Sequence, residues 1–211
     1  MKRLCIAVLF LSVCCDYQST LAQTPTRART ENGKEVLLFP NGTWKSVEEA
    51  RTKESPNNRY QKAIGATTLF KPERGNFGVW YDEKKWKIGT NQTELGSRTG
   101  FNLLRGDGYA LVIAEGLQMP LSALRQAAIG NATAVSKDAK VIVEETRTVN
   151  GNQVLFMQID GTIQDIPFSY LGYYYSGKQG AIQVITYTGQ SLVSKYRLDM
   201  EEFLNGLEVY Q

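Results

Sequence analysis

The chain has 211 residues, of which 42% are hydrophobic and 21% charged, a composition that provides one domain-sized apolar core and a small additional unit. It contains no histidine, and its three cysteines are Cys5, Cys14 and Cys15, so the usual ligands of zinc, haem and copper and any Ser-His or Cys-His nucleophile are missing beyond residue 15. The formal net charge of +3 gives little attraction to nucleic acid, and we predict no nucleic-acid partner.

Residues 1–22 have the three-part layout of a secretory signal. Two basic residues precede an apolar run over 4–15, which is shorter than the roughly 20 residues of a membrane-spanning helix. Cleavage after Ala22 is therefore expected, giving an exported bacterial protein in the periplasm or outside the cell, with no transmembrane segment. The alternative is lipoprotein processing with a lipid anchor at Cys14 or Cys15, which the bulk of Val13 disfavours.

Residues 23–58 are predicted to form a polar tail, a short hairpin and a linker. The tail covers 23–34. The hairpin pairs 35–39 with 43–45 around Asn41-Gly42, which is a strong turn signal. The charged segment 46–58 then leads to the main domain, predicted over residues 59–211.

The first part of the main domain is predicted to combine strands with one helix. Strands are expected at 77–81, 86–88, 101–105 and 109–115. A helix opens at Pro120 with Leu121, Leu124 and Ala128 on one face, and Gly130-Asn131 is expected to end it.

Four β-rich runs then follow, at 141–149, 153–160, 167–176 and 181–188, and predict an antiparallel meander. Asp160-Gly161 is interpreted as one of its turns. The run 153–160 is apolar on both parities, so both faces of the sheet are expected to be covered. A C-terminal helix is predicted because six apolar residues fall on one face: Val193, Tyr196, Met200, Phe203, Leu204 and Leu207. Asp199 with Glu202 is interpreted as a capping pair that restarts this helix.

Five segments, "FGVWYDEKKWKI", "MPLSALRQAAIGNA", "VNGNQVLFMQIDG", "YLGYYYSGKQGAIQVITYT" and "YRLDMEEFLNGLE", together resemble the PsbP-like superfamily over residues 60–210. That group also contains a Ran-binding nuclear import factor and small exported bacterial proteins. The resemblance implies an α+β fold, an α/β/α sandwich around an antiparallel sheet, whose members mostly bind proteins or stabilise assemblies. It offers no shared catalytic motif. Separately, "GKEVLLFPNGTW" resembles a short motif near the start of exported bacterial proteins.

Aromatic residues are the candidate binding residues. Strand alternation places Tyr173 and Tyr175 on one face and Tyr170 and Tyr174 on the other, so one pair is expected in the core and the other could line a groove. We single out Trp80, Trp86, Tyr173 and Tyr175 as candidates. The competing interpretation is that these rings pack under helices.

We therefore predict an exported, non-catalytic binding or assembly-stabilising protein of the bacterial cell envelope, with a protein partner. No catalytic residue, metal site or cofactor is assigned. The alternative is a small-molecule binding protein or a carboxylate-based hydrolase, with a pocket between sheet and helix in which acidic residues converge.

Overall fold

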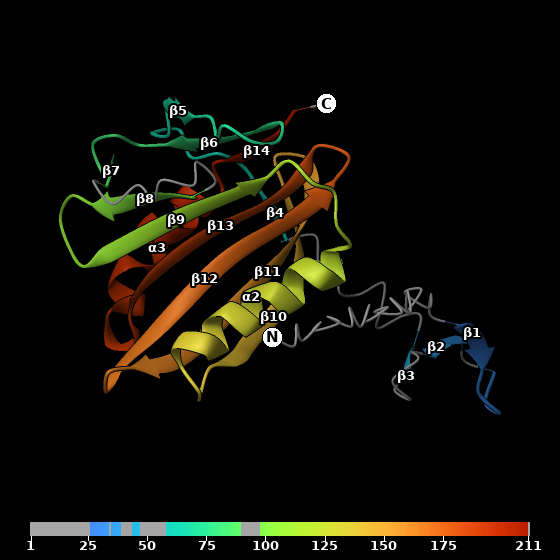
Figure 1. The fold of residues 1–211 in the computed structure, drawn as a ribbon. Coiled ribbons are helices and arrows are strands. Elements are labelled where there is room, and N and C mark those ends of the chain that lie inside the picture. Colours follow the sequence, from blue (N-terminus) through green and yellow to red (C-terminus); the bar gives the residue numbers. More distant parts are fainter. Residues whose placement is uncertain (1–25, 34, 39–43, 47–57, 90–97, 211) are drawn as a thin grey trace, which may run out of the picture. The chain divides into compact units, whose positions relative to one another are not determined.

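A computed structural model describes residues 26–33, 35–38, 44–46, 58–89 and 98–210 of the chain, which divides into two compact units, Met1–Thr52 and Lys53–Gln211 (Figure 1). The N-terminal unit contains a three-stranded antiparallel sheet of order β1-β2-β3, with bounds Thr26–Arg29, Glu35–Leu38 and Trp44–Ser46. β2 and β3 form the predicted hairpin, although its turn at 39–43 lies outside the described residues. The segment expected to be a tail contains β1, which pairs with β2 and is joined to it by an ion pair between Arg29 and Glu35 at 3.2 Å. The predicted signal sequence also lies outside the described residues.

The second unit is built on an eight-stranded sheet of order β4-β10-β11-β12-β13-β9-β8-β7. Its strands are antiparallel except at the β4–β10 pair, and β10 to β13 form the predicted meander. The bounds are Arg59–Tyr60 (β4), Trp86–Ile88 (β7), Arg98–Leu103 (β8), Gly108–Glu115 (β9), Lys140–Val149 (β10), Asn152–Ile163 (β11), Ile166–Gly177 (β12) and Gly180–Gly189 (β13).

A helix packs on each face of this sheet, and both faces of β11 are covered, as expected from its doubly apolar run (Figure 1). Helix α2, Leu121–Val135, packs on one face, chiefly over β10, β11 and β12. Helix α3, Val193–Leu204, packs on the other face after a short 3-10 turn, Gln190–Leu192. A small sheet of order β14-β6-β5 lies on the α3 side, with bounds Leu207–Val209, Phe77–Tyr81 and Thr68–Phe70. The architecture is α+β, with helices on both sides of the sheet.

Three predictions about the helices were wrong. Helix α2 continues through Gly130 to Val135, because Ala132 is buried against the sheet and its packing outweighs the low helix propensity of glycine. Helix α3 is continuous, and Asp199 and Glu202 bind the ammonium group of Lys85 at 2.8 and 2.7 Å rather than capping a helix. Leu207 belongs to β14.

The turn expected at Asp160-Gly161 is displaced along the chain. β11 runs on to Ile163, and the reversal occurs at Gln164 and Asp165, where φ is +48° and +64°. Asp160 instead accepts hydrogen bonds within the sheet from Ser169 at 2.7 Å and Gln158 at 3.1 Å.

Candidate functional site

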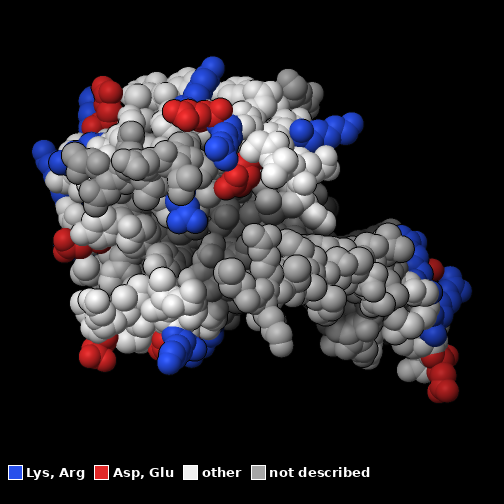
Figure 2. All heavy atoms as spheres, in the orientation of Figure 1, with Lys and Arg blue, Asp and Glu red and all other residues white. Residues whose placement is uncertain are grey.

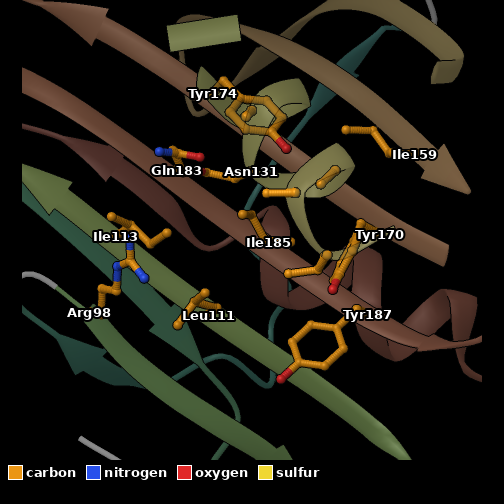
Figure 3. Close-up of a pocket in the computed structure, with 14 residues that line it drawn as sticks. Arg98, Leu111, Ile113, Asn131, Ile159, Tyr170, Tyr174, Gln183, Ile185 and Tyr187 are labelled. Carbon is orange, nitrogen blue, oxygen red and sulfur yellow. The ribbon is translucent and has the colours of Figure 1, made fainter. Parts of the chain in front are cut away.

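A hollow on the described part of the second unit lies between α2 and the sheet, and we call it the α2 cleft (Figure 3). Its volume is about 400 Å³, within the range of small-ligand sites. It exists because α2 packs chiefly over β10 to β12, which leaves the same face of β13, β9 and β8 without a helix. Its lining residues are Arg98, Leu111, Ile113, Ala128, Asn131, Ala132, Ala134, Val135, Ile159, Tyr170, Tyr174, Gln183, Ile185 and Tyr187.

Strand register arranges the floor of the cleft into rows that cross the sheet. The polar row contains Arg98, Ile113, Gln183 and Tyr174, which are successive register partners on β8, β9, β13 and β12. The next row along the strands contains Gly100, Leu111, Ile185 and Gly172, and is apolar. The third row contains Asn102, Tyr109, Tyr187 and Tyr170. Arg98 and Gln183 therefore lie at one end of the floor, and Tyr170 and Tyr187 at the other.

The aromatic row is held by ring contacts. Tyr187 stacks on Tyr109 at a centroid distance of 5.3 Å and meets Tyr170 edge-on at 5.3 Å. Burial raises the pKa of Tyr170 and Tyr187 above the ordinary value of 10.0. Both hydroxyls are therefore neutral at physiological pH and can donate hydrogen bonds.

Two side chains of the polar row are almost fully buried and yet have free polar atoms. Tyr174 is 2% exposed and Gln183 7% exposed, and neither makes a hydrogen bond with a residue that the structure describes. No described side-chain nitrogen or oxygen is both fully enclosed and unpaired, so the Tyr174 hydroxyl and the Gln183 amide must reach open space. Since both residues line the cleft, that space is the cleft itself (Figure 3).

Because Gly172 has no side chain, the Tyr174 ring can lie directly against the strand at the floor of the cleft. A Cβ at this position would lie 2.7 Å from the Tyr174 hydroxyl and 2.8 Å from a ring carbon, so the ring lies directly across the glycine. Burial raises the pKa of Tyr174 well above its ordinary value, with a smaller contribution from Tyr170. The hydroxyl is therefore a neutral donor placed inside an apolar space.

The described lining of the cleft carries a single positive charge. Arg98, which is exposed, is the one charged side chain among the described lining residues, and it makes no ion pair with a described residue. Elsewhere on the face drawn in Figure 2, basic and acidic side chains are interspersed over the part of the chain that the structure describes. The cleft thus combines a positive rim with neutral hydrogen-bond donors.

Two of the sequence candidates lie in the core on the α3 side of the sheet. Trp86 is buried and packs on Phe203 of α3 at a centroid distance of 4.9 Å. The side chain of Tyr173 is fully buried, where its hydroxyl donates to Asn205 at 2.8 Å and accepts from Arg147 at 3.3 Å. The other two are partly exposed, and the structure does not bring the four together into one exposed site.

Trp80 and Tyr175 each make a hydrogen bond to a nearby side chain. The Trp80 indole donates to Glu208 at 2.5 Å, and the Tyr175 hydroxyl bonds Gln179 at 3.0 Å. A binding role for these residues stays a prediction. Sequence reasoning placed Tyr170 and Tyr174 on the opposite face to Tyr173 and Tyr175, and the structure places that other pair in the α2 cleft.

A pocket between sheet and helix, expected under the alternative function, is present, but its described lining contains no Asp or Glu. Nor do three or more metal-ligating side chains gather anywhere in the described residues. Within the same residues, neither helix has the length and apolar character required to cross a membrane.

No protein-family model matches the sequence, and neither does any curated protein. Among solved structures, the PsbP of the cyanobacterium Synechocystis sp. PCC 6803 is similar to this chain, with 13% identity and a TM-score of 0.53 over 70% of this chain and 95% of that chain. A Pseudomonas aeruginosa protein of unknown function has 7% identity and a TM-score of 0.43, over 68% of this chain and 97% of that chain. LpqN of Mycobacterium tuberculosis, described as involved in cell envelope biogenesis, has 6% identity and a TM-score of 0.41, over 68% and 90%. The likeness to the cyanobacterial PsbP shows that the fold of this chain is PsbP-like, and at 13% identity it shows the fold alone.

Proposed function

We propose that this chain, whose fold is PsbP-like, is an exported, non-catalytic binding protein of a bacterial cell envelope, and that its binding site is the α2 cleft. The observation that carries the proposal is the pair of free polar groups, the Tyr174 hydroxyl and the Gln183 amide, held nine-tenths buried in an apolar space. Both groups open into the cleft, and an occupant with matching donors and acceptors can pair with them.

The lining supports binding rather than catalysis. Its described members are aliphatic, aromatic or amide side chains together with one arginine, and none of them pairs with another as a nucleophile with a base. Such apolar walls with a few convergent polar groups are typical of sites that retain a ligand. Export is supported by the signal-like residues 1–22.

The sequence predicts a protein partner, and the cleft is large enough for apolar side chains of a protein or for a separate small molecule. Site-specific photo-crosslinking in the cells that export the protein tests whether anything binds there. A photoreactive amino acid replaces Val135, which is 57% exposed at the cleft, or Leu198, which is 68% exposed on α3 as the control. Intact-mass and peptide mass spectrometry then identify the adduct.

The proposal predicts an adduct at Val135 that is absent at Leu198. It also predicts that Leu111→Trp, which fills the cleft from β9, abolishes this adduct, whereas Leu117→Trp, at an exposed position outside the lining, does not. No adduct at Val135, or the same adducts at both positions, would show that the cleft is not the binding site.

A further inference from the structure

The order of polar, aliphatic and aromatic side chains along the cleft indicates which class of molecule can bind there. The polar row holds Arg98 and Gln183, and the aromatic row holds Tyr187 and Tyr170. From Gln183 to Tyr187 the strand advances four residues, or about 13 Å. Between them lies the half-buried side chain of Ile185. An occupant that matches this order has a polar head at one end and an extended apolar body.

The positive charge in the cleft indicates a negatively charged head group on the bound molecule. Arg98 is the one charged side chain in the described lining, and Gln183, two strands along the same row, can also donate hydrogen bonds. Glu115, two residues beyond Ile113 on β9, is 3.8 Å from Arg74 and so is engaged with another cation. A carboxylate has one negative charge and several acceptor sites, which complements this set of donors.

The aliphatic and aromatic walls of the cleft indicate that the rest of the bound molecule is apolar. Ile113 and Ile159 are buried, and Leu111 and Ile185 are half-buried in the floor. Each CH₂ group moved from water into such surroundings contributes about 0.8 kcal/mol, so an alkyl chain supplies most of the binding free energy. The head group supplies orientation and selectivity.

Resting on the proposed function, we infer that the α2 cleft binds a single-chain amphiphile with one carboxylate, such as a medium-chain fatty acid. The carboxylate lies at Arg98 and Gln183, and the chain lies along Ile185 toward Tyr187 and Tyr170.

The test compares decanoate with decanol, which has the same chain without the charge, both below their aggregation concentrations and with the full mature chain. Binding is followed by the NMR shifts of isoleucine methyl groups. Ile113 and Ile185 line the cleft, whereas Ile182, on the opposite side of β13, lies in the core under α3 and is the internal control. Leu111→Trp should abolish the shifts of both ligands.

We expect decanoate to bind about two- to fivefold more tightly than decanol, the preference that one exposed ion pair provides. Arg98→Gln should remove this preference and leave decanol binding unchanged. Arg105→Gln, at an exposed arginine outside the cleft lining, is the matched control and should retain it.

The outcomes separate the two proposals. If neither ligand shifts Ile113 or Ile185 and the crosslinking experiment also gives no adduct, the cleft is not a binding site and the proposed function fails. If both ligands bind equally, or if Arg98→Gln changes nothing, the cleft binds apolar molecules but the assignment of a carboxylate is overturned. Shifts that spread equally to Ile182 would show non-specific binding and would also overturn it.

Discussion

Replacing Tyr173 by phenylalanine removes one hydroxyl from the buried side of the sheet that faces α3. This hydroxyl donates to Asn205 at 2.8 Å and accepts from Arg147 at 3.3 Å. Arg147 is itself buried, and it keeps its bond to Glu145 at 2.7 Å and its position over the Phe156 ring, 3.6 Å from the centroid. The substitution therefore leaves the side-chain oxygen of Asn205 without its donor. It also leaves one N–H of the Arg147 guanidinium without its acceptor.

We expect Tyr173→Phe to lower the free energy of unfolding by about 1–3 kcal/mol at pH 7, the cost of unpaired buried polar groups. Tyr175→Phe is the matched control on the same strand. Its hydroxyl bonds Gln179 in a partly buried hairpin, so the loss should stay within about 0.5 kcal/mol. Urea unfolding followed by circular dichroism measures both.

The difference between wild type and Tyr173→Phe should also depend on pH. Burial raises the pKa of Tyr173 from 10.0 to about 12, although the bond from Arg147 opposes the rise. The folded protein therefore holds this proton where the unfolded chain loses it, so the contribution to stability is intact below pH 10 and is lost as the pH rises through 12. At pH 11 the loss is about 1.4 kcal/mol. The wild-type advantage should shrink by that amount.

Unchanged stability of Tyr173→Phe at pH 7, or a loss as large in Tyr175→Phe, would refute this reasoning. It would also restore Tyr173 as a candidate for partner binding, because a residue that contacts a partner can lose its hydroxyl without affecting the fold. A wild-type advantage that is the same at pH 7 and pH 11 would show that the hydroxyl is not buried in solution.

Three further substitutions test the packing and the electrostatics of the second unit. Gly206→Ala would place a Cβ 1.8 Å from the Trp80 carbonyl oxygen, so the backbone must move and we expect a loss of about 3 kcal/mol or more, seen as a lower Tm. Gly130→Ala, in the interior of α2 with no atom within 4 Å of the new Cβ, should raise the stability by about 0.5–1 kcal/mol in the same assay. Hydrogen bonds, led by that from Ser136, lower the pKa of Asp138 to about 2, so its contribution is present above pH 4 and is lost as the pH falls through 2. Asp138→Asn should therefore give a flatter stability profile between pH 4 and pH 2, and an unchanged slope in acid unfolding would contradict the assignment.

The layers of the fold could be predicted because they depend on periodicity. The run 153–160 is apolar on both parities, and the structure divides it accordingly: Val154 and Phe156 join the core under α3, and Met157 and Ile159 the core under α2. Element ends were less predictable, because they depend on tertiary packing. Gly130 was expected to end α2, yet the helix continues because Ala132 on the next turn is buried.

The position of the cleft could not be predicted from the sequence. Parity places Tyr173 and Tyr174 on opposite faces but does not say which face is left partly uncovered. That depends on where the 15 residues of α2 lie across the sheet, which is a tertiary property. The available signal was Gln183, which lies between apolar residues in a run predicted to be a buried strand.

Strand β13 shows how a structural polar group differs from one available to a ligand. Three of its polar side chains are buried to a similar degree: Thr186, Thr188 and Gln183. On the α3 side, the Thr186 hydroxyl donates to the Leu171 carbonyl at 3.3 Å and the Thr188 hydroxyl to the Asp107 carbonyl at 2.6 Å. On the α2 side, Gln183 has no partner among the described residues. β13 therefore satisfies its polar groups within the protein on the α3 face and leaves the Gln183 amide open to the cleft on the α2 face, where water or a ligand can pair with it.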